Sequence, residues 1–370
     1  MNDRYPIGLE EEYFLVDAET KAVTRNMPQG FLEAARQISG GCLRTEFLQS
    51  QLEAVTHPHS NIKAAHEELR HLRRTAAQVA AEHGLAILAA GTHPTADWGR
   101  SQQSEGDRYD AVMDDLQMIG RRNMLCGLHV HIELPDPDER VDVMTRMLPY
   151  LPLLIALATS SPFWRSRRTG LKGYRLAAYD ELPRTGVPEL MRSKEEFDAY
   201  VEALVKSGVM DNASYIWWSM RPSLAHPTLE LRAPDCPTRV DDSIAIAALY
   251  RALARHLVCN PWKHTDLNAI DRAIVVENKW RAQRYGVEGS FVGPNGAVGV
   301  GEFLETVLTD IADDACALHC LDEVQRCRDI VGGGTSADAQ LSVYDRNSPD
   351  ESRQRALQAV NDWLAVATLQ

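Results

Sequence analysis

Residues 128–134 are the most informative stretch of this chain and read Leu128-His129-Val130-His131-Ile132-Glu133-Leu134. Successive side chains of a β-strand point to opposite faces of the sheet. The two histidines and Glu133 therefore share one face, and the four aliphatic side chains share the other. This alternation predicts a strand with an apolar back and a front that carries imidazole and carboxylate groups.

Two further stretches follow the same alternation. In residues 8–14, Glu10 and Glu12 share a face that continues towards apolar residues. In residues 228–233, Glu230 and Arg232 share a face and leucines oppose them. The simplest arrangement places all three stretches in one sheet with an apolar back and a front crowded with Glu, His and Arg. Such a front suits divalent cations and phosphate.

Length and composition describe an ordinary globular chain. Its 370 residues are 44% hydrophobic and 25% charged, enough for a large core in one domain or in two smaller ones. Because no repeats or long linker divide the chain, we expect one domain over residues 1–370. The net charge of -13 argues against a general binder of nucleic acid or of anionic membranes. No apolar signal-peptide core is present, and seven cysteines form no disulfide framework, so we expect a reducing cytoplasm.

The remaining pattern predicts strands and helices without regular alternation. We expect strands at residues 7–17, 21–25, 47–56 and 86–91. We expect helices at residues 62–83, 108–124, 138–159 (broken near its prolines), 195–207, 240–258, 267–285, 301–330 and 350–369, with a loop at 160–173 and a glycine-rich loop at 286–301. The prediction is an α+β fold: a largely antiparallel sheet whose apolar face is covered by helices.

The histidine pair has three interpretations. Two imidazoles on one strand face can bind Zn²⁺, as in a hydrolase. Alternatively, His129 and His131 assist a Mg²⁺ or Mn²⁺ site in which carboxylates dominate, or they are simply hydrogen-bonded sheet histidines. The excess of Glu on the candidate faces favours the harder cation, because carboxylates such as Glu10 and Glu12 near a core need a cation or hydrogen bonds.

The pair Glu230 and Arg232 has two interpretations. It is either a cross-strand ion pair or a combination suited to Mg²⁺ and a transferring phosphoryl group, whose charge arginine stabilises. The phosphate-binding P-loop, the dinucleotide-binding Gly-x-Gly-x-x-Gly motif and the Gly-x-Ser-x-Gly nucleophile motif are all absent from the sequence.

An ordered set of motifs resembles the YbdK-type carboxylate-amine ligases, a family described as type 2 glutamate–cysteine ligases. The matching motifs span nearly the whole chain: Gly8-Leu9-Glu10-Glu11-Glu12, Gln51-x-Glu53, Gly127-Leu128-His129-Val130-His131, Ser161-Pro162-Phe163-Trp164 through Gly170 to Arg175, Arg221-Pro222-Ser223, Pro227-Thr228-Leu229-Glu230-Leu231-Arg232 and Glu277-Asn278-Lys279-Trp280-Arg281-Ala282.

The resemblance implies a fold like the catalytic domains of glutamine synthetase and guanido kinases, with the active site on the open sheet face. It implies Mg²⁺ ions (with Mn²⁺ as a substitute), held by Glu10, Glu12, Glu46, Glu53, His129 and Glu230. It also implies catalytic roles for Glu230 and Arg232, with Arg232 meeting the transferred phosphate. It further implies that His131, Arg175 and Arg221 bind substrate or phosphate. The resemblance assigns no role to the basic loop at residues 165–175.

The activity implied by the resemblance is ATP-dependent. The γ-carboxylate of glutamate is joined to an amine such as cysteine through an acyl phosphate, with weak glutamate–cysteine ligase activity and a homodimeric assembly. Two alternatives stay open. One is a zinc or manganese hydrolase that uses His129 and His131, with His57 or His93 as further ligands. The other is a non-catalytic protein that binds a nucleotide or metabolite.

Overall fold

A seven-stranded sheet forms the centre of the computed structural model, which describes residues 5–97, 99, 102–104, 106–348 and 352–370. The strand order is β2-β3-β1-β5-β9-β8, and β4 pairs with the second half of the long strand β1. Every pairing in this sheet is antiparallel. The strands are β1 (Ile7–Asp17), β2 (Leu43–Thr45), β3 (Gln51–Val55), β4 (Leu85–Leu88), β5 (Leu128–Glu133), β8 (Met220–Pro222) and β9 (Thr228–Leu231).

The strand register gathers the charged residues on one face, here called the front. Glu10 of β1 pairs with His129 of β5, and Glu12 pairs with Glu53 of β3. One strand further along, His131 pairs with Glu230. Directly paired residues of antiparallel strands project to the same side. The three alternating stretches therefore form one continuous polar front.

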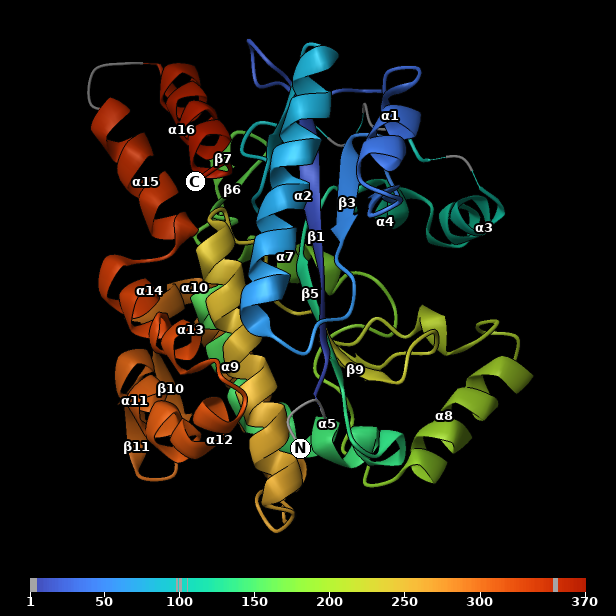
Figure 1. Cartoon of the computed structure of the whole chain (residues 1–370), viewed down its shortest axis with the longest axis vertical. Helices are drawn as coiled ribbons and strands as arrows, with labels where there is room; N and C mark the ends of the chain where they lie inside the picture. Colours follow the sequence, from blue (N-terminus) through green and yellow to red (C-terminus); the bar gives the residue numbers. More distant parts are fainter. Residues whose placement is uncertain (1–4, 98, 100–101, 105, 349–351) are drawn as a thin grey trace.

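The opposite face, here called the back, is covered by helices. Figure 1 shows α2 (Ile62–Glu82) and α9 (Val240–Cys259) lying side by side across it. The side chain of Asn61 caps α2 by accepting a hydrogen bond of 2.8 Å from the Lys63 N–H. The strands contribute Leu9, Val130 and Leu229 to the buried apolar layer. These helices thus cover the apolar back of the strands and leave the polar front uncovered.

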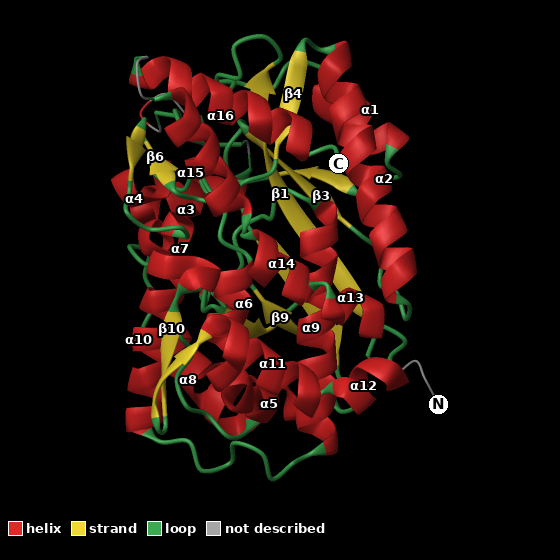
Figure 2. Cartoon of the chain, turned by 90° about the vertical axis from the view of Figure 1, so that its left-hand side faces the viewer, coloured by secondary structure: helices red, strands yellow, loops and turns green. Residues whose placement is uncertain are grey.

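The other helices pack around this two-layer centre. Figure 2 shows the last helix, α16, beside β4. The helices other than α2 and α9 are α1 (Phe31–Ile38), α3 (Asp107–Leu116), α4 (Met118–Arg121), α5 (Arg140–Met147), α6 (Leu151–Leu157), α7 (Tyr174–Tyr179), α8 (Lys194–Lys206), α10 (Ala269–Tyr285), α11 (Val300–Asp310), α12 (Ala312–Ala317), α13 (Leu321–Gln325), α14 (Cys327–Gly333), α15 (Ser336–Asn347) and α16 (Arg353–Ala367). Short 3-10 helices occur at η2 (Pro137–Glu139), η3 (Leu148–Tyr150), η4 (Ala213–Tyr215) and η5 (Gly286–Glu288). No helix formed by the described residues is both long and apolar enough to cross a membrane.

The α+β prediction is confirmed, but several element boundaries are wrong. The helix expected at 301–330 is four helices, and the helix expected at 108–124 ends at Gln117 before a short second helix. Positive φ angles at Gln117 (51°) and His319 (52°) interrupt the helices. Neither residue is a glycine, the residue type from which a positive φ angle can be predicted in a sequence. The helix expected at 350–369 is α16, and residues 350 and 351 lie outside the described part.

Strand predictions also need correction. Only Gln51–Val55 of the expected strand at 47–56 is regular, and the expected strand at 21–25 is a single bridge between Val16 and Val23. The glycine-rich stretch at 286–301, expected as a loop, contains the hairpin of β10 (Ser290–Gly293) and β11 (Gly296–Gly299). A second hairpin, β6 (Phe163–Trp164) and β7 (Arg167–Arg168), lies inside the loop expected at 160–173.

Candidate functional site

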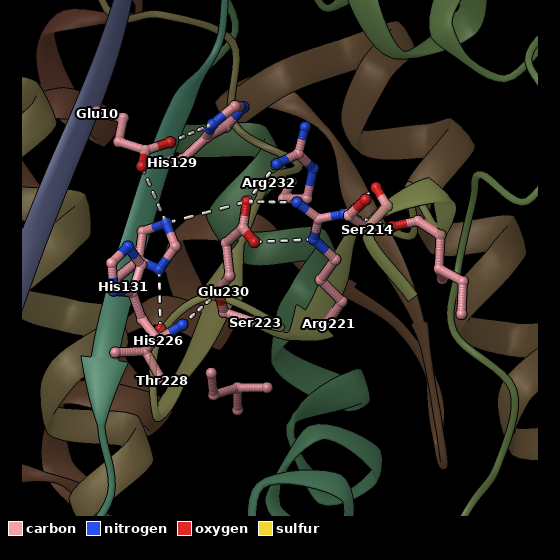
Figure 3. A network of polar contacts seen from close by, with 12 residues as sticks. Glu10, His129, His131, Ser214, Arg221, Ser223, His226, Thr228, Glu230 and Arg232 are labelled. Carbon is pink, nitrogen blue, oxygen red and sulfur yellow. Dashed lines mark hydrogen bonds and ion pairs between the residues drawn. The ribbon is translucent and has the colours of Figure 1, made fainter. Parts of the chain in front are cut away.

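Carboxylates and imidazoles meet on the front of the sheet. The two oxygens of Glu10 contact both histidines of β5: Oε2 lies 3.0 Å from His129 Nδ1, and Oε1 lies 3.4 Å from His131 Nε2. His129 Nε2 lies 3.7 Å from Glu12 Oε1. Figure 3 shows the Glu10, His129, His131 and Glu230 part of this network. The alternation of two strands has placed these groups on one surface.

Two groupings of possible metal ligands share His129. One contains Glu10, His129 and Glu230, the other Glu12, Glu53 and His129, and the ligand atoms of each grouping lie within 4.8 Å of one another. The Nε2 atoms of His129 and His131 are buried and have no hydrogen-bond partner among the described residues. Buried polar atoms without a partner call for a ligand. Oxygen-rich donor sets of this kind suit Mg²⁺ or Mn²⁺.

The electrostatics of the front also favour a cation. Burial, with repulsion from Glu46, raises the pKa of Glu12 to about 7. Burial and the nearby Glu10 and Glu46 hold the pKa of Glu53 well above its usual range. Burial also acts to raise the pKa of Glu10, but the close contacts of its carboxylate with His129 and His131 outweigh it and leave that pKa well below its usual range. A bound cation would offset this concentration of negative charge.

Glu230 is held between two arginines. Arg221 Nε donates a 2.8 Å hydrogen bond to Glu230 Oε2, and Arg232 Nη1 contacts Glu230 Oε1. Burial raises the pKa of Glu230, but the charges of Arg232 and then Arg221 outweigh it and lower the pKa below its usual range. Arg232 Nε is buried without a hydrogen-bond partner among the described residues. The Arg232 guanidinium therefore keeps one donor for a ligand.

Arg175 and Arg221 also anchor the surrounding loops. Arg175 Nη1 donates to the carbonyl oxygens of Arg232 and Pro234, each at 3.2 Å, and its guanidinium lies over the Tyr179 ring. Gly127 makes room for it, since a Cβ there would lie 2.2 Å from Arg175 Nη2. Arg221 Nη1 donates to the carbonyl oxygens at residues 214 and 216. Both arginines thus position the backbone beside the site.

Two pockets border the carboxylate cluster. One, of about 210 Å³, is lined by residues that include Glu12, Glu46, Gln51, Arg175, Tyr179 and Arg232. The other, of about 280 Å³, is lined by residues that include Glu10, Arg44, His57, His131, His226 and Thr228. The cluster therefore has space for a small molecule on either side.

The residues predicted from the sequence converge on this site. Glu46, proposed only by resemblance, lines the same pocket as Glu12 and interacts with it. The extra hydrolase histidines do not join His129: His57 contacts Glu68, and His93 Nε2 lies 2.9 Å from the Lys21 carbonyl oxygen.

Some residues that line the site were missed. Gln51 shares the strand face of Glu53, and its Oε1 has no hydrogen-bond partner among the described residues. Tyr179 lies one helical turn beyond Arg175, a spacing that could have identified it. Trp217 also lines the pocket, and no pattern in the sequence indicates that it does.

Solved structures share this fold. The crystal structure of a glutamate–cysteine ligase from Francisella tularensis, in complex with AMP, has a TM-score of 0.71 at 14% identity and covers 99% of this chain and 89% of that one. A bifunctional glutathione synthetase from Pasteurella multocida has a TM-score of 0.70 at 16% identity over 99% of this chain. This chain spans 53% of that bifunctional protein, about half its length. At these identities the likeness concerns the fold.

Sequence comparisons identify the family. The model of glutamate–cysteine ligase family 2 (GCS2) matches residues 6–360. A protein of Bradyrhizobium sp. strain ORS 278, named "Putative glutamate–cysteine ligase 2", is 56% identical over 365 residues, 99% of this chain and 88% of that protein. A Rhodospirillum rubrum protein of the same name is 40% identical over 377 residues, 99% of this chain and 96% of its own. The chain belongs to the glutamate–cysteine ligase family 2.

Proposed function

We propose that this chain is an ATP-dependent carboxylate-amine ligase that joins the γ-carboxylate of glutamate to an amine such as cysteine. The observation that carries the proposal is the pair of Glu–His groupings that share His129, next to Arg232 with its unused Nε donor. The names of the relatives and the ligase fold support the same reaction class. The carboxylate-rich donor sets favour it over a zinc hydrolase.

In this proposal the acidic and histidine residues of the front bind Mg²⁺, and Arg232 binds the phosphoryl group. Glu10, His129 and Glu230 would hold one Mg²⁺ ion, and Glu12 and Glu53 would hold a second, because a neutral imidazole has one lone pair and ligates a single ion. Bound Mg²⁺ supplies neutralisation of the phosphate charges. Arg232 adds a donor for the phosphoryl group during its transfer, where charge stabilisation is the main catalytic contribution.

The proposed reaction has two steps. A γ-carboxylate oxygen of glutamate attacks the γ-phosphorus of ATP, so that ADP leaves and an acyl phosphate forms. The amine nitrogen then attacks the acyl carbon, inorganic phosphate leaves, and the nitrogen loses a proton. The pockets on the two sides of the cluster offer space for two substrates. Positioning both reactants supplies much of the rate in such a mechanism.

The first experiment measures ADP release from ATP and Mg²⁺ with glutamate, with and without cysteine and a panel of other amines. We expect release that depends on both glutamate and one amine. We expect Arg232→Ala to lower turnover by a factor of about 10³ or more, because the loss of an arginine at a transferring phosphoryl group costs about 10³–10⁵. We expect Glu230→Gln to lower turnover as well, because it removes a carboxylate from the proposed Mg²⁺ site. The acceptor amine is identified by the same panel.

The control is Glu305→Gln, which makes the same substitution in an exposed ion pair with Arg328 on the far helices. It should leave turnover unchanged. Circular dichroism of all variants separates lost chemistry from lost folding. Near-normal turnover by either folded site variant would contradict the proposal, and so would substrate hydrolysis that needs no ATP.

A further inference from the structure

A second cluster of metal-binding side chains lies outside the two groupings on the front. Cys42 precedes β2, His57 follows β3, and Glu68 lies on α2. One ligand atom of each residue lies within 4.8 Å of the others. Cys42 Sγ is 3.8 Å from His57 Nδ1, and that nitrogen is 2.6 Å from Glu68 Oε1. Three different elements of the fold thus bring a thiol, an imidazole and a carboxylate to one point.

The carboxylate of this cluster is held in a defined orientation. The backbone N–H of His57 donates a 3.0 Å hydrogen bond to Glu68 Oε2, and the ring of His59 also contacts that oxygen. Glu68 Oε1 is therefore turned towards His57 and Cys42. Partners that orient a ligand without binding the ion are a regular part of metal sites and tune their affinity. In this cluster, His59 is such a partner, because its ring contacts Glu68 and orients the carboxylate.

Burial within the cluster is graded. Cys42 is 7% exposed, and its carbonyl oxygen accepts a 2.8 Å hydrogen bond from the Val55 N–H. The His57 ring, with 69% of its side chain exposed, faces solvent. Burial, and then the charge of Glu68, raise the pKa of the Cys42 thiol. The sulfur is thus fixed by the sheet edge, while a solvent-facing side leaves an entry path and a free coordination position.

We propose that Cys42, His57 and Glu68 bind a transition-metal cation of the Zn²⁺ class, separately from the Mg²⁺ ions proposed for the front. Thiolate, imidazole and carboxylate ligands with a fourth position for water form a donor set that Zn²⁺ accepts. A thiolate ligand discriminates against Mg²⁺, which prefers oxygen. As the sulfur–metal bond forms, the thiol proton passes to solvent, so binding strengthens as pH rises.

The site would join three parts of the molecule. Cys42 precedes the edge strand β2, His57 follows its neighbour β3, and Glu68 belongs to the helix α2 that covers the back. His57 also lines the pocket of about 280 Å³ to which Glu10 and His131 contribute. A bound ion would therefore fix the sheet edge and one wall of that pocket at the same time.

The test is a Co²⁺ titration of the metal-free full-length chain in excess Mg²⁺, followed by the thiolate-to-cobalt charge-transfer absorption in the near ultraviolet. We expect one equivalent of Co²⁺ to produce this band and Zn²⁺ to abolish it by displacement. The two front groupings contain no cysteine, so metal bound there cannot produce the band. The readout needs neither ATP nor turnover, so its outcome is independent of the proposed ligase activity.

Three variants make the test specific. Cys42→Ser should lose the band, whereas Cys259→Ser, which changes an exposed cysteine elsewhere, should keep it. Cys42 is buried, so its substitution can also disturb folding. The substitution His57→Gln changes an exposed side chain and therefore serves as a second test, and we expect it to weaken Co²⁺ binding at least about tenfold. Absence of the band in the unmodified chain, or an unchanged band in folded Cys42→Ser, would overturn the proposal. Unchanged affinity in His57→Gln would also overturn it.

Discussion

The two faces of the central sheet both bury charged side chains, but they satisfy them differently. On the back, Glu11 accepts two hydrogen bonds of 2.7 Å from Arg73, one of 2.6 Å from the Tyr13 hydroxyl and one from Ser243. Arg73 also donates to the Thr238 carbonyl oxygen at 2.6 Å. On the front, several buried donor and acceptor atoms have no such partners in the part of the chain that the structure describes.

The front contrasts with this closed network at the level of single atoms. The Nε2 atoms of His129 and His131 and the Nε of Arg232 are buried without hydrogen-bond partners among the described residues. The carboxylates of Glu10, Glu46 and Glu12 also help to raise the pKa of Glu53, and Glu46 helps to raise the pKa of Glu12. Removing one partner of a complete buried ion pair destabilises the fold, whereas buried polar atoms that lack a partner mark places where a ligand can bind. Adjacent residues of one strand, Glu11 and Glu12, fall on opposite sides of this division.

The largest expected effect on stability comes from breaking the back network. Arg73→Met leaves Glu11 buried without its cation, which should cost about 3–5 kcal/mol of unfolding free energy. Urea unfolding followed by circular dichroism measures the loss. The double variant Glu11→Leu with Arg73→Met should recover much of it, because an apolar pair replaces the ion pair. Stability of the single variant equal to that of the unmodified chain would contradict the structural role of this network.

A buried histidine with both ring nitrogens occupied sharpens the contrast with His131. His93 Nε2 lies 2.9 Å from the Lys21 carbonyl oxygen, and Nδ1 accepts from the Thr95 N–H at 3.2 Å. Burial lowers the pKa of His93 from 6.5 to about 4. The unfolded chain therefore takes up this proton first as pH falls from about 6.5 to about 4. Stability is lost across that window, by about 3 kcal/mol at about 1.36 kcal/mol per pKa unit.

His93→Gln removes this titration while keeping a donor for the Lys21 carbonyl. We expect the gap in unfolding free energy between the unmodified chain and the variant to narrow by about 3 kcal/mol from pH 7.5 to pH 4. Urea titrations at both pH values measure it, and other titrating groups cancel in the difference. A gap that is constant with pH would show that His93 is not held neutral in the fold.

The smallest expected effect has the opposite sign and lies on the front. Glu12→Gln removes one of the crowded carboxylates, so the chain without divalent cations should gain about 0.5–2 kcal/mol of stability, the usual size of such gains at functional sites. Thermal unfolding in EDTA measures the gain. The same variant should gain less stability from Mg²⁺ than the unmodified chain. If Glu12→Gln instead destabilises the protein, the Glu12 carboxylate stabilises the fold, as Glu11 does, and the prediction is wrong.

Several site residues could be predicted from short stretches because strand alternation is a local property. Glu10, His129 and Glu230 each lie in a strand whose apolar residues occupy every second position. Resemblance added Glu46, which stands outside any regular strand pattern. Local patterns could not predict that Arg175 holds backbone carbonyls, since those carbonyls belong to a segment more than 50 residues away in the sequence.

The sequence by itself determined the two-faced strands, the α+β class and most of the charged front, because these depend on side-chain order within a few residues. Only the tertiary structure decided which strands are neighbours, where Gln117 and His319 interrupt helices, and which buried atoms have partners. It also brought Cys42 and His57 to Glu68 on another element. The physical reason is that strand order, register and long-range packing are set by contacts between distant segments, which no local periodicity contains.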